Sequence, residues 1–168
     1  MGSDITRAET YELGLQMRRR VLGEGHVNRS LDQVTEFSRP IQEFVTEYCW
    51  GATWTREGLD LRVRSMLNLA MLTALNRPFE LAAHVRGALQ NGVTVSEIQE
   101  VLLQTAIYVG VPAALESYRV AEQVLIDSGA FADDEQPTPP ELPQQQKLSD
   151  QQEPDQRPDR GQPVSPSS

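Results

Sequence analysis

The segment LDLRVRSMLNLAMLTAL, residues 59–75, decides the fold because it is the most apolar stretch of the 168-residue chain. Its length and its content of Leu, Met and Ala favour a buried helix over a strand. The sequence Asn-Arg-Pro at 76–78 follows directly and ends this helix. Beside several less apolar helices, such a segment is expected at the centre of the fold or at a subunit interface.

Two helices are expected before this segment. Residues 7–22, RAETYELGLQMRRRVL, carry apolar residues at helical spacing and a basic end that suits a helix C-terminus. The sequence Gly-Glu-Gly at 23–25 then breaks the helix, and residues 28–30 form a polar stretch. Pro40 opens the second helix and Gly51 is expected to end it.

Three more helices are expected after the segment. Residues 79–90 form a short helix that ends at the Asn-Gly pair 91–92. Thr94 and Glu97 form a capping box that opens the next helix, and the last helix covers about 112–128. No segment alternates with a period of two residues, so the sequence predicts a compact, multi-helix, all-α fold.

The composition changes near residue 131. The part before it is rich in Leu, Val, Ala and Ile, whereas residues 132–168 hold eight of the eleven prolines together with many Gln, Ser, Asp and Glu. Such a stretch cannot offset the entropy cost of ordering by burying apolar surface. The sequence therefore predicts one helical domain, residues 1–131, and a disordered tail, residues 132–168.

Charge and cysteine content exclude several classes of protein. The net charge is −9 and no run of Lys and Arg could follow a phosphate backbone, so nucleic acid is not an expected partner. The single cysteine, Cys49, excludes a disulfide framework within one chain and is expected to be a small buried side chain. No apolar run follows the first Met or reaches membrane-spanning length, so we expect a cytoplasmic protein without membrane contact.

Five motifs in this order resemble the carboxymuconolactone decarboxylase family. They are VLGEGHV at 21–27, FVTEYCWG at 44–51, LDLRVRSMLNLAML at 59–72, LNRPFELAAHVRGALQNGV at 75–93 and EIQEVLLQTAIYVGVPAA at 97–114. The resemblance implies a helical alkyl hydroperoxidase D-like fold and cofactor-free decarboxylation of γ-carboxymuconolactone to the β-ketoadipate enol-lactone in aromatic catabolism. It also implies a homo-oligomer, either a trimer or a hexamer.

The peroxidase branch of the same fold differs from this chain at its reactive positions. Peroxidase relatives use a Cys-x-x-Cys pair, a His four residues after the second Cys, and a relay Glu on the preceding helix. In this chain His84 occupies the His position, but Arg77 and Glu80 stand at the Cys positions and Ser65 at the Glu position. The thiol chemistry is therefore absent, and peroxidase activity is not expected.

The implied reaction sets three tasks for the protein. Loss of CO2 leaves a carbanion conjugated to the lactone carbonyl, so the substrate contains its own electron sink and requires neither a metal nor pyridoxal phosphate. The protein must hold two carboxylates, stabilise the developing enolate oxygen and deliver a proton to carbon.

Arginines are the expected groups for holding the carboxylates, because their fork donates two hydrogen bonds. Arg62, Arg64 and Arg86 are the candidates. Arg62 and Arg64 are two residues apart on a helix and do not share a face, so at most one of them is expected to point into the site. A solvent-exposed or interface ion pair is the alternative for each.

His84 is the candidate proton donor, because an imidazole titrates near neutral pH. Glu80, four residues earlier on the same helix face, can favour the charged form of His84. The alternative is a core or surface histidine without a chemical role.

The remaining candidates are assigned less directly. His26 lies in a Gly-rich turn and either closes over the site or caps the loop. Glu47 is a second possible proton carrier, with a solvated helix carboxylate as the alternative. The aromatic residues Trp50, Trp54 and Tyr108 are expected to pack the core or wall a pocket.

Two other functions stay open from the sequence. The first is a homologous decarboxylase or isomerase that acts on another small carbonyl or lactone acid, for example in secondary metabolism; the long Pro- and Gln-rich tail departs from the compact family pattern and favours it. The second is a non-enzymatic helical oligomer that uses the fold for binding.

Overall fold

A computed structural model describes residues 6–131, and every regular element within them is a helix. The all-α prediction is therefore confirmed. The elements, in chain order, are α1 (Arg7–Leu22), α2 (Glu24–Asp32), α3 (Arg39–Phe44), the π-helix η1 (Val45–Trp54), α4 (Leu61–Ala74), α5 (Pro78–Gln90), α6 (Val95–Tyr108) and α7 (Val111–Asp127). None of these helices is long and apolar enough to cross a membrane. The expected tail, residues 132–168, lies outside the described residues.

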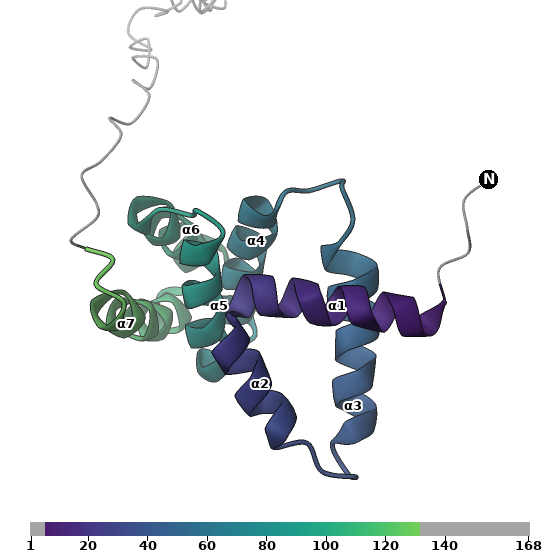
Figure 1. The fold of residues 1–168 in the computed structure, drawn as a ribbon. Coiled ribbons are helices and arrows are strands. Elements are labelled where there is room, and N and C mark those ends of the chain that lie inside the picture. Colours follow the sequence, from purple (N-terminus) through teal and green to yellow (C-terminus); the bar gives the residue numbers. More distant parts are fainter. Residues whose placement is uncertain (1–5, 132–168) are drawn as a thin grey trace, which may run out of the picture. The chain divides into compact units, whose positions relative to one another are not determined.

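Helix α1 lies across the continuous helix formed by α3 and η1 (Figure 1). The close crossing depends on two glycines. A Cβ on Gly14 would lie 2.0 Å from the Thr46 carbonyl oxygen, and a Cβ on Gly51 would lie 2.2 Å from the Thr10 carbonyl oxygen. Neither position has room for a side chain, because the opposing atoms belong to backbone.

The predicted helix end at Gly51 is wrong. The helix opened at Pro40 continues through this glycine to Trp54, with the wider π-helical turn from Val45 onward. The sequence suggested a helix end because glycine is a weak helix former. The structure uses the missing Cβ of Gly51 for contact with α1 instead.

The break predicted after α1 is only partly correct. Gly23 has a positive φ of 86° and ends α1, but Glu24–Asp32 then form a second helix that contains Gly25. Val27 is the one buried residue of α2, so this short helix buries little apolar surface. Hydrogen bonds from arginines of α1 to Asn28 and Ser30 fasten this helix instead.

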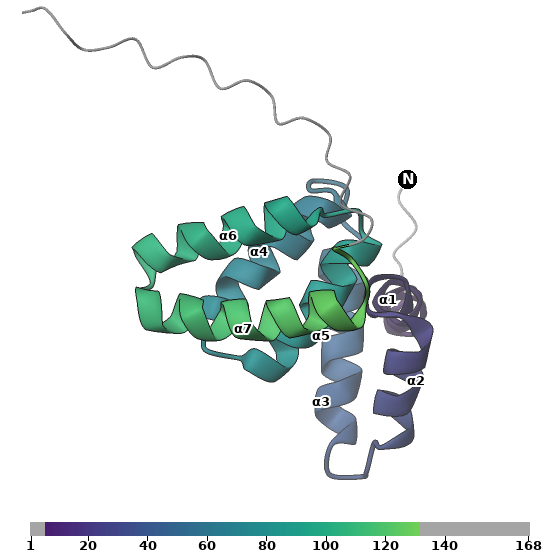
Figure 2. The same ribbon diagram turned by 90° about the vertical axis from the view of Figure 1, so that its left-hand side faces the viewer.

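The second half packs α4, α6 and α7 around α5, and Figure 2 shows α6 and α7 side by side. Its apolar core comes from all four helices and the turn after α5: Leu69, Leu81, Val85, Ala88, Val93, Ile98, Leu102, Ala121, Val124 and Leu125. Helix α5 contacts α1, α4, α6 and α7, so α5 rather than the segment 59–75 occupies the centre. Helix α4 buries one side, while Leu67, Met71 and Leu75 remain about half exposed or more.

The predicted helix boundaries of this half are confirmed. Thr94 and Glu97 cap each other's backbone N–H groups as a capping box. Gly92 follows α5 with a φ of 81°, and Gly129 follows α7 with a φ of 68°, so both occupy the left-handed region that favours glycine.

Candidate functional site

His84 lies on α5 against two buried tryptophans of η1. The His84 ring is 6.1 Å from the Trp50 ring and nearly parallel to it, and 6.3 Å from the Trp54 ring. The two indoles stack on each other at 4.9 Å. The wider turn of the π-helix brings side chains four residues apart nearly into line, so η1 presents both rings to the histidine. The expectation that these tryptophans are core or wall residues is confirmed.

Asn68, on α4, fixes the other edge of the imidazole. Its Nδ2 atom lies 3.4 Å from Nδ1 of His84. An amide nitrogen donates, so Nδ1 accepts and the proton of the neutral ring resides on Nε2. Sequence reasoning missed this residue. The signal was an asparagine inside the most apolar segment of the chain.

His84 is neutral in the unliganded protein at neutral pH. Its pKa is lowered from 6.5 to about 4, chiefly by burial and to a smaller extent by His26, while Glu80 opposes the shift. Glu80 is exposed to solvent. It favours the charged form of His84, as predicted, but its effect is smaller than that of burial.

A positive environment surrounds His26, which is half-buried on α2 close to His84. Burial lowers the pKa of His26, and the positive charges of Arg86, Arg29 and Arg18 lower it further. His26 therefore lies in the same cluster as His84, on helix α2 instead of in a turn. Arg86 is exposed on α5, beside this cluster.

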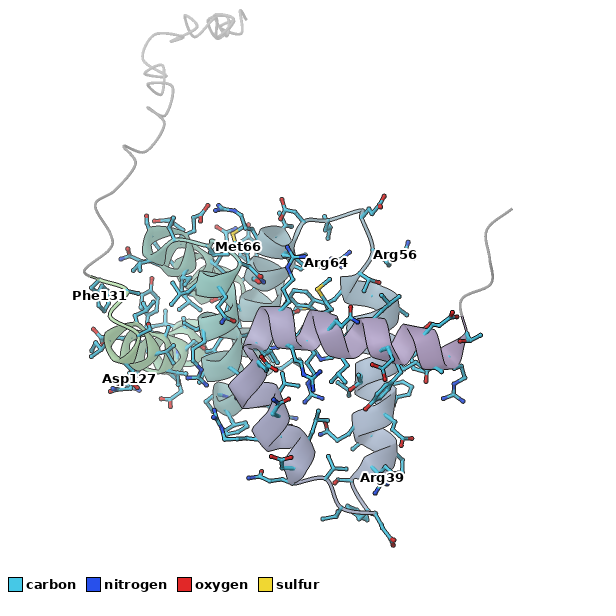
Figure 3. The ribbon with its side chains drawn as sticks, in the orientation of Figure 1. Arg39, Arg56, Arg64, Met66, Asp127 and Phe131 are labelled. Carbon is cyan, nitrogen blue, oxygen red and sulfur yellow. The ribbon has the colours of Figure 1, made fainter. Side chains whose placement is uncertain are left out.

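Arg62 and Arg64 are both engaged by the protein itself. Arg62 donates to the Glu97 carboxylate and to the Gly92 carbonyl. Arg64 donates to the carbonyl oxygens of Leu59 and Arg56, at 3.2 and 2.9 Å, and so fastens the connection between η1 and α4 (Figure 3). Their partners differ, as expected for side chains two residues apart.

A cavity of about 540 Å³ lies next to this connection. Its lining includes Trp54, Arg20, Arg56, Arg62 and Asp60. His84 does not line the cavity, but Trp54 both lines it and lies against His84. The cavity therefore adjoins the histidine cluster through one indole ring.

The structure contradicts the expected surroundings of Glu47, Tyr108 and Cys49. Glu47 is only 7% exposed, and Arg7 donates to both of its carboxylate oxygens, at 2.9 and 2.8 Å. Because Glu47 is buried and paired, the alternative of a solvated carboxylate is wrong. The hydrogen bond from Arg7 lowers the pKa of Glu47, which makes this carboxylate a poor proton donor near neutral pH. Tyr108 is 79% exposed instead of packing in the core, because the end of α6 carries it outward, and Cys49 is also exposed.

Ser65, which stands at the relay position of the peroxidase branch, is buried and accepts a hydrogen bond of 2.9 Å from the side chain of Asn91. This contact links α4 to the end of α5. Within residues 6–131, no three side chains of His, Cys, Asp or Glu gather closely enough to bind a metal ion.

Comparison with known proteins gives a consistent result. Residues 39–123 match the carboxymuconolactone decarboxylase family. The chain is 41% identical over 121 residues to the 4-carboxymuconolactone decarboxylase of Acinetobacter baylyi, covering 72% of this chain and 90% of that protein. It is 38% identical over 138 residues to a nitrosuccinic acid decarboxylase of Metarhizium robertsii, covering 78% of this chain and 96% of the relative.

Proposed function

This chain belongs to the carboxymuconolactone decarboxylase family. We propose that it removes CO2 from γ-carboxymuconolactone and so forms the β-ketoadipate enol-lactone. The relatives at 41% and 38% identity are decarboxylases, and the chain is accordingly a carboxy-lyase acting on a small-molecule carboxylate. What we propose beyond this is that the acid is γ-carboxymuconolactone, that the reaction belongs to the β-ketoadipate pathway, and that the protein acts in the cytoplasm.

The reaction needs no electron acceptor outside the substrate. The bond between the γ-carbon and the carboxylate breaks, CO2 departs, and the electron pair moves onto the lactone carbonyl as an enolate. A proton delivered to carbon then completes the product. Three requirements fall on the protein, namely a positive environment for the anionic substrate, stabilisation of the developing enolate oxygen and a proton donor for carbon.

The position of His84 is the observation that carries this proposal. Asn68 holds Nδ1, so Nε2 carries the proton and is the ring atom left to donate to a substrate. The pKa of His84 is about 4 without substrate. A bound substrate adds two carboxylates near the ring, and their negative charge raises this pKa towards neutrality. The acid is thereby formed when the substrate is present.

The indoles of Trp50 and Trp54 provide the apolar wall of the same site. A planar unsaturated lactone matches such a surface, and exclusion of water strengthens each charge interaction there. The candidates for binding a carboxylate are His26, whose charge acts on His84, and Arg86, whose charge acts on His26. Arg62 is engaged by Glu97 and Gly92, and Arg64 supports the connection between η1 and α4, so both have a lesser part in this proposal.

Nitrosuccinate is the second candidate substrate, because the Metarhizium robertsii relative is matched over 96% of its length. The chemistry is parallel. A nitro group next to the departing carboxylate accepts the electron pair as a nitronate, and carbon is then protonated. The same histidine would serve both acids, so the two candidates differ only in the shape required of the pocket.

We also propose that the protein is a homo-oligomer, a trimer or a hexamer. Apolar side chains remain exposed on α4, at the start of α5 and at the end of α6: Leu67, Met71, Leu75, Phe79, Leu103, Ile107 and Tyr108. An apolar surface of this kind is typical of a subunit contact. Light scattering at micromolar concentration should give the mass of three or six chains. Met71→Glu places a charge on this apolar surface and should lower the measured mass towards that of a single chain. A monomer in the unmodified protein would contradict this.

The substrate is tested by supplying γ-carboxymuconolactone and nitrosuccinate separately and measuring released CO2. We expect turnover of the lactone with kcat/KM at least about tenfold above that of nitrosuccinate, the discrimination that a few pocket contacts provide. The reverse order would assign the chain to the second candidate. Absence of CO2 from both acids would reject both.

A further inference from the structure

Arg18 is a buried arginine without a carboxylate partner. Its side chain is 7% exposed, deep among α1, α2, α3 and η1. Nη1 donates to Gln42 at 3.0 Å and to Thr46 at 3.4 Å, and Nη2 donates to Ser30 at 3.2 Å. All three acceptors are neutral. The ion pairs found in the described part of the chain involve other arginines.

The donors that remain on Arg18 form the fork that carboxylates bind. Its Nε–H is buried and has no acceptor within residues 6–131, and Nη2 has a single acceptor for its two hydrogens. Two other arginines of α1 show what this edge binds. Arg7 directs Nε and Nη2 to the two oxygens of Glu47, and Arg19 directs the same two atoms to the Asn28 amide oxygen.

A charge in this position is costly unless something compensates it. Burial lowers the pKa of Arg18, and the groups that oppose this effect are Tyr11 and Cys49 rather than a carboxylate. Removing a guanidinium from water carries a large free-energy cost, which neutral hydrogen bonds recover only in part. The fold therefore tolerates an uncompensated cation, and an anion that binds at it recovers this cost.

The surroundings of Arg18 connect it with the histidine cluster. Its charge lowers the pKa of His26, and His26 in turn lowers that of His84. Thr46, which contacts Arg18, lies four residues before Trp50, which contacts His84, on the same π-helix. Arg18 is thus linked to the histidine cluster through the charge of His26 and through its contact with η1.

We propose that Arg18 binds one carboxylate of the substrate through its free Nε and Nη2 donors, and so serves as the buried anion receptor of the site. This inference rests on the proposed function, which places the substrate beside His84. It assigns as substrate a small molecule with at least two acidic groups. One carboxylate is held at Arg18, while the reacting carbon lies towards His84.

The test uses succinate, a dicarboxylate that is not consumed, and measures its Kd by calorimetry on the full chain. Arg18→Gln should weaken binding by about tenfold or more, because a charged two-pronged contact is lost. Arg18→Lys keeps the positive charge but not the two-pronged donor, so its Kd for succinate should lie between those of the unmodified chain and Arg18→Gln. Arg19→Gln is the matched control on the same helix, and it should bind succinate as the unmodified chain does.

Thermal unfolding without succinate provides a readout that separates binding from structure. Arg18→Gln should unfold at the same temperature as the unmodified chain or higher, because an unpaired buried charge is removed. Succinate should then raise Tm of the unmodified chain and of Arg19→Gln, but not of Arg18→Gln. Equal Kd values for Arg18→Gln and the unmodified chain would overturn the proposal, as would a chain that binds no succinate.

These outcomes are distinguishable from failure of the proposed function. If CO2 is not released from either candidate acid but succinate binding still depends on Arg18, the receptor stands and the proposed substrates fall. If CO2 is released with unchanged KM in Arg18→Gln and Arg18→Lys, the receptor falls and the decarboxylase remains.

Discussion

The stability of this protein should depend on pH through His84. A histidine whose pKa is lower in the folded than in the unfolded chain binds fewer protons when folded, so acid favours unfolding. The pKa of His84 falls from 6.5 to about 4 on folding. Its contribution is therefore fully present above about pH 6.5, is lost as the pH falls towards 4, and changes no further below that value.

The magnitude follows from the same two values. They differ by about 2.5, and each pKa unit corresponds to about 1.4 kcal/mol, so protonation at His84 removes about 3 kcal/mol of folding free energy across this range. That is a large share of the stability of an ordinary domain, which is about 5–15 kcal/mol.

The assay is urea unfolding at a series of pH values between 7 and 4, followed by the fluorescence of the buried tryptophans. The variant His84→Gln keeps an acceptor for Asn68 but cannot titrate. Its free energy of unfolding should therefore fall by about 3 kcal/mol less than that of the unmodified chain between pH 7 and 4. Glu9 and Glu47 also have lowered pKa values and lose stabilisation in acid, but equally in both proteins. Parallel pH curves for the two proteins would refute the assignment of a buried neutral His84. His26→Gln serves as the second-histidine control and should retain most of the dependence.

Three further outcomes are expected. Gly14→Ala should destabilise the fold by about 2 kcal/mol or more in urea unfolding, because its Cβ would meet backbone of η1, whereas Gly58→Ala, with open space around it, should change the free energy of unfolding by about 0.5 kcal/mol or less. Glu47→Gln should lower Tm by weakening the contact with Arg7 yet leave kcat unchanged; a hundredfold fall in kcat at an unchanged fold would return Glu47 to the chemistry. A chain ending at Phe131 should release CO2 at the rate of the full chain, and a slower rate would show that residues 132–168 contribute.

The second half of the fold could be predicted closely because local signals agree with tertiary structure there. The capping box at Thr94 and the glycine after α5 mark helix ends by their own hydrogen bonding and backbone conformation. The first half resisted prediction because its glycines serve contacts between helices. Gly51 packs against Thr10, and nothing in its sequence neighbours indicates this partner.

The sequence indicates His84 and the tryptophans of the candidate site, but not the residues that contact them from other helices. Asn68 holds the imidazole from another helix, and only the packing of α4 on α5 reveals it. The arginines show the same limit. Arg64 is one of the three candidates from the sequence, but it donates to carbonyl oxygens of the connection between η1 and α4. Arg18 belongs to an Arg-Arg-Arg run that suits a helix end, and its burial depends on α2 and α3.

Release of CO2 from γ-carboxymuconolactone by the unmodified chain and by His84→Gln tests the central claim most directly. We expect kcat to fall by about a hundredfold or more in the variant, the usual contribution of a general acid, while Tm at pH 7.5 stays close to that of the unmodified chain. Full activity in a folded His84→Gln protein would contradict the account.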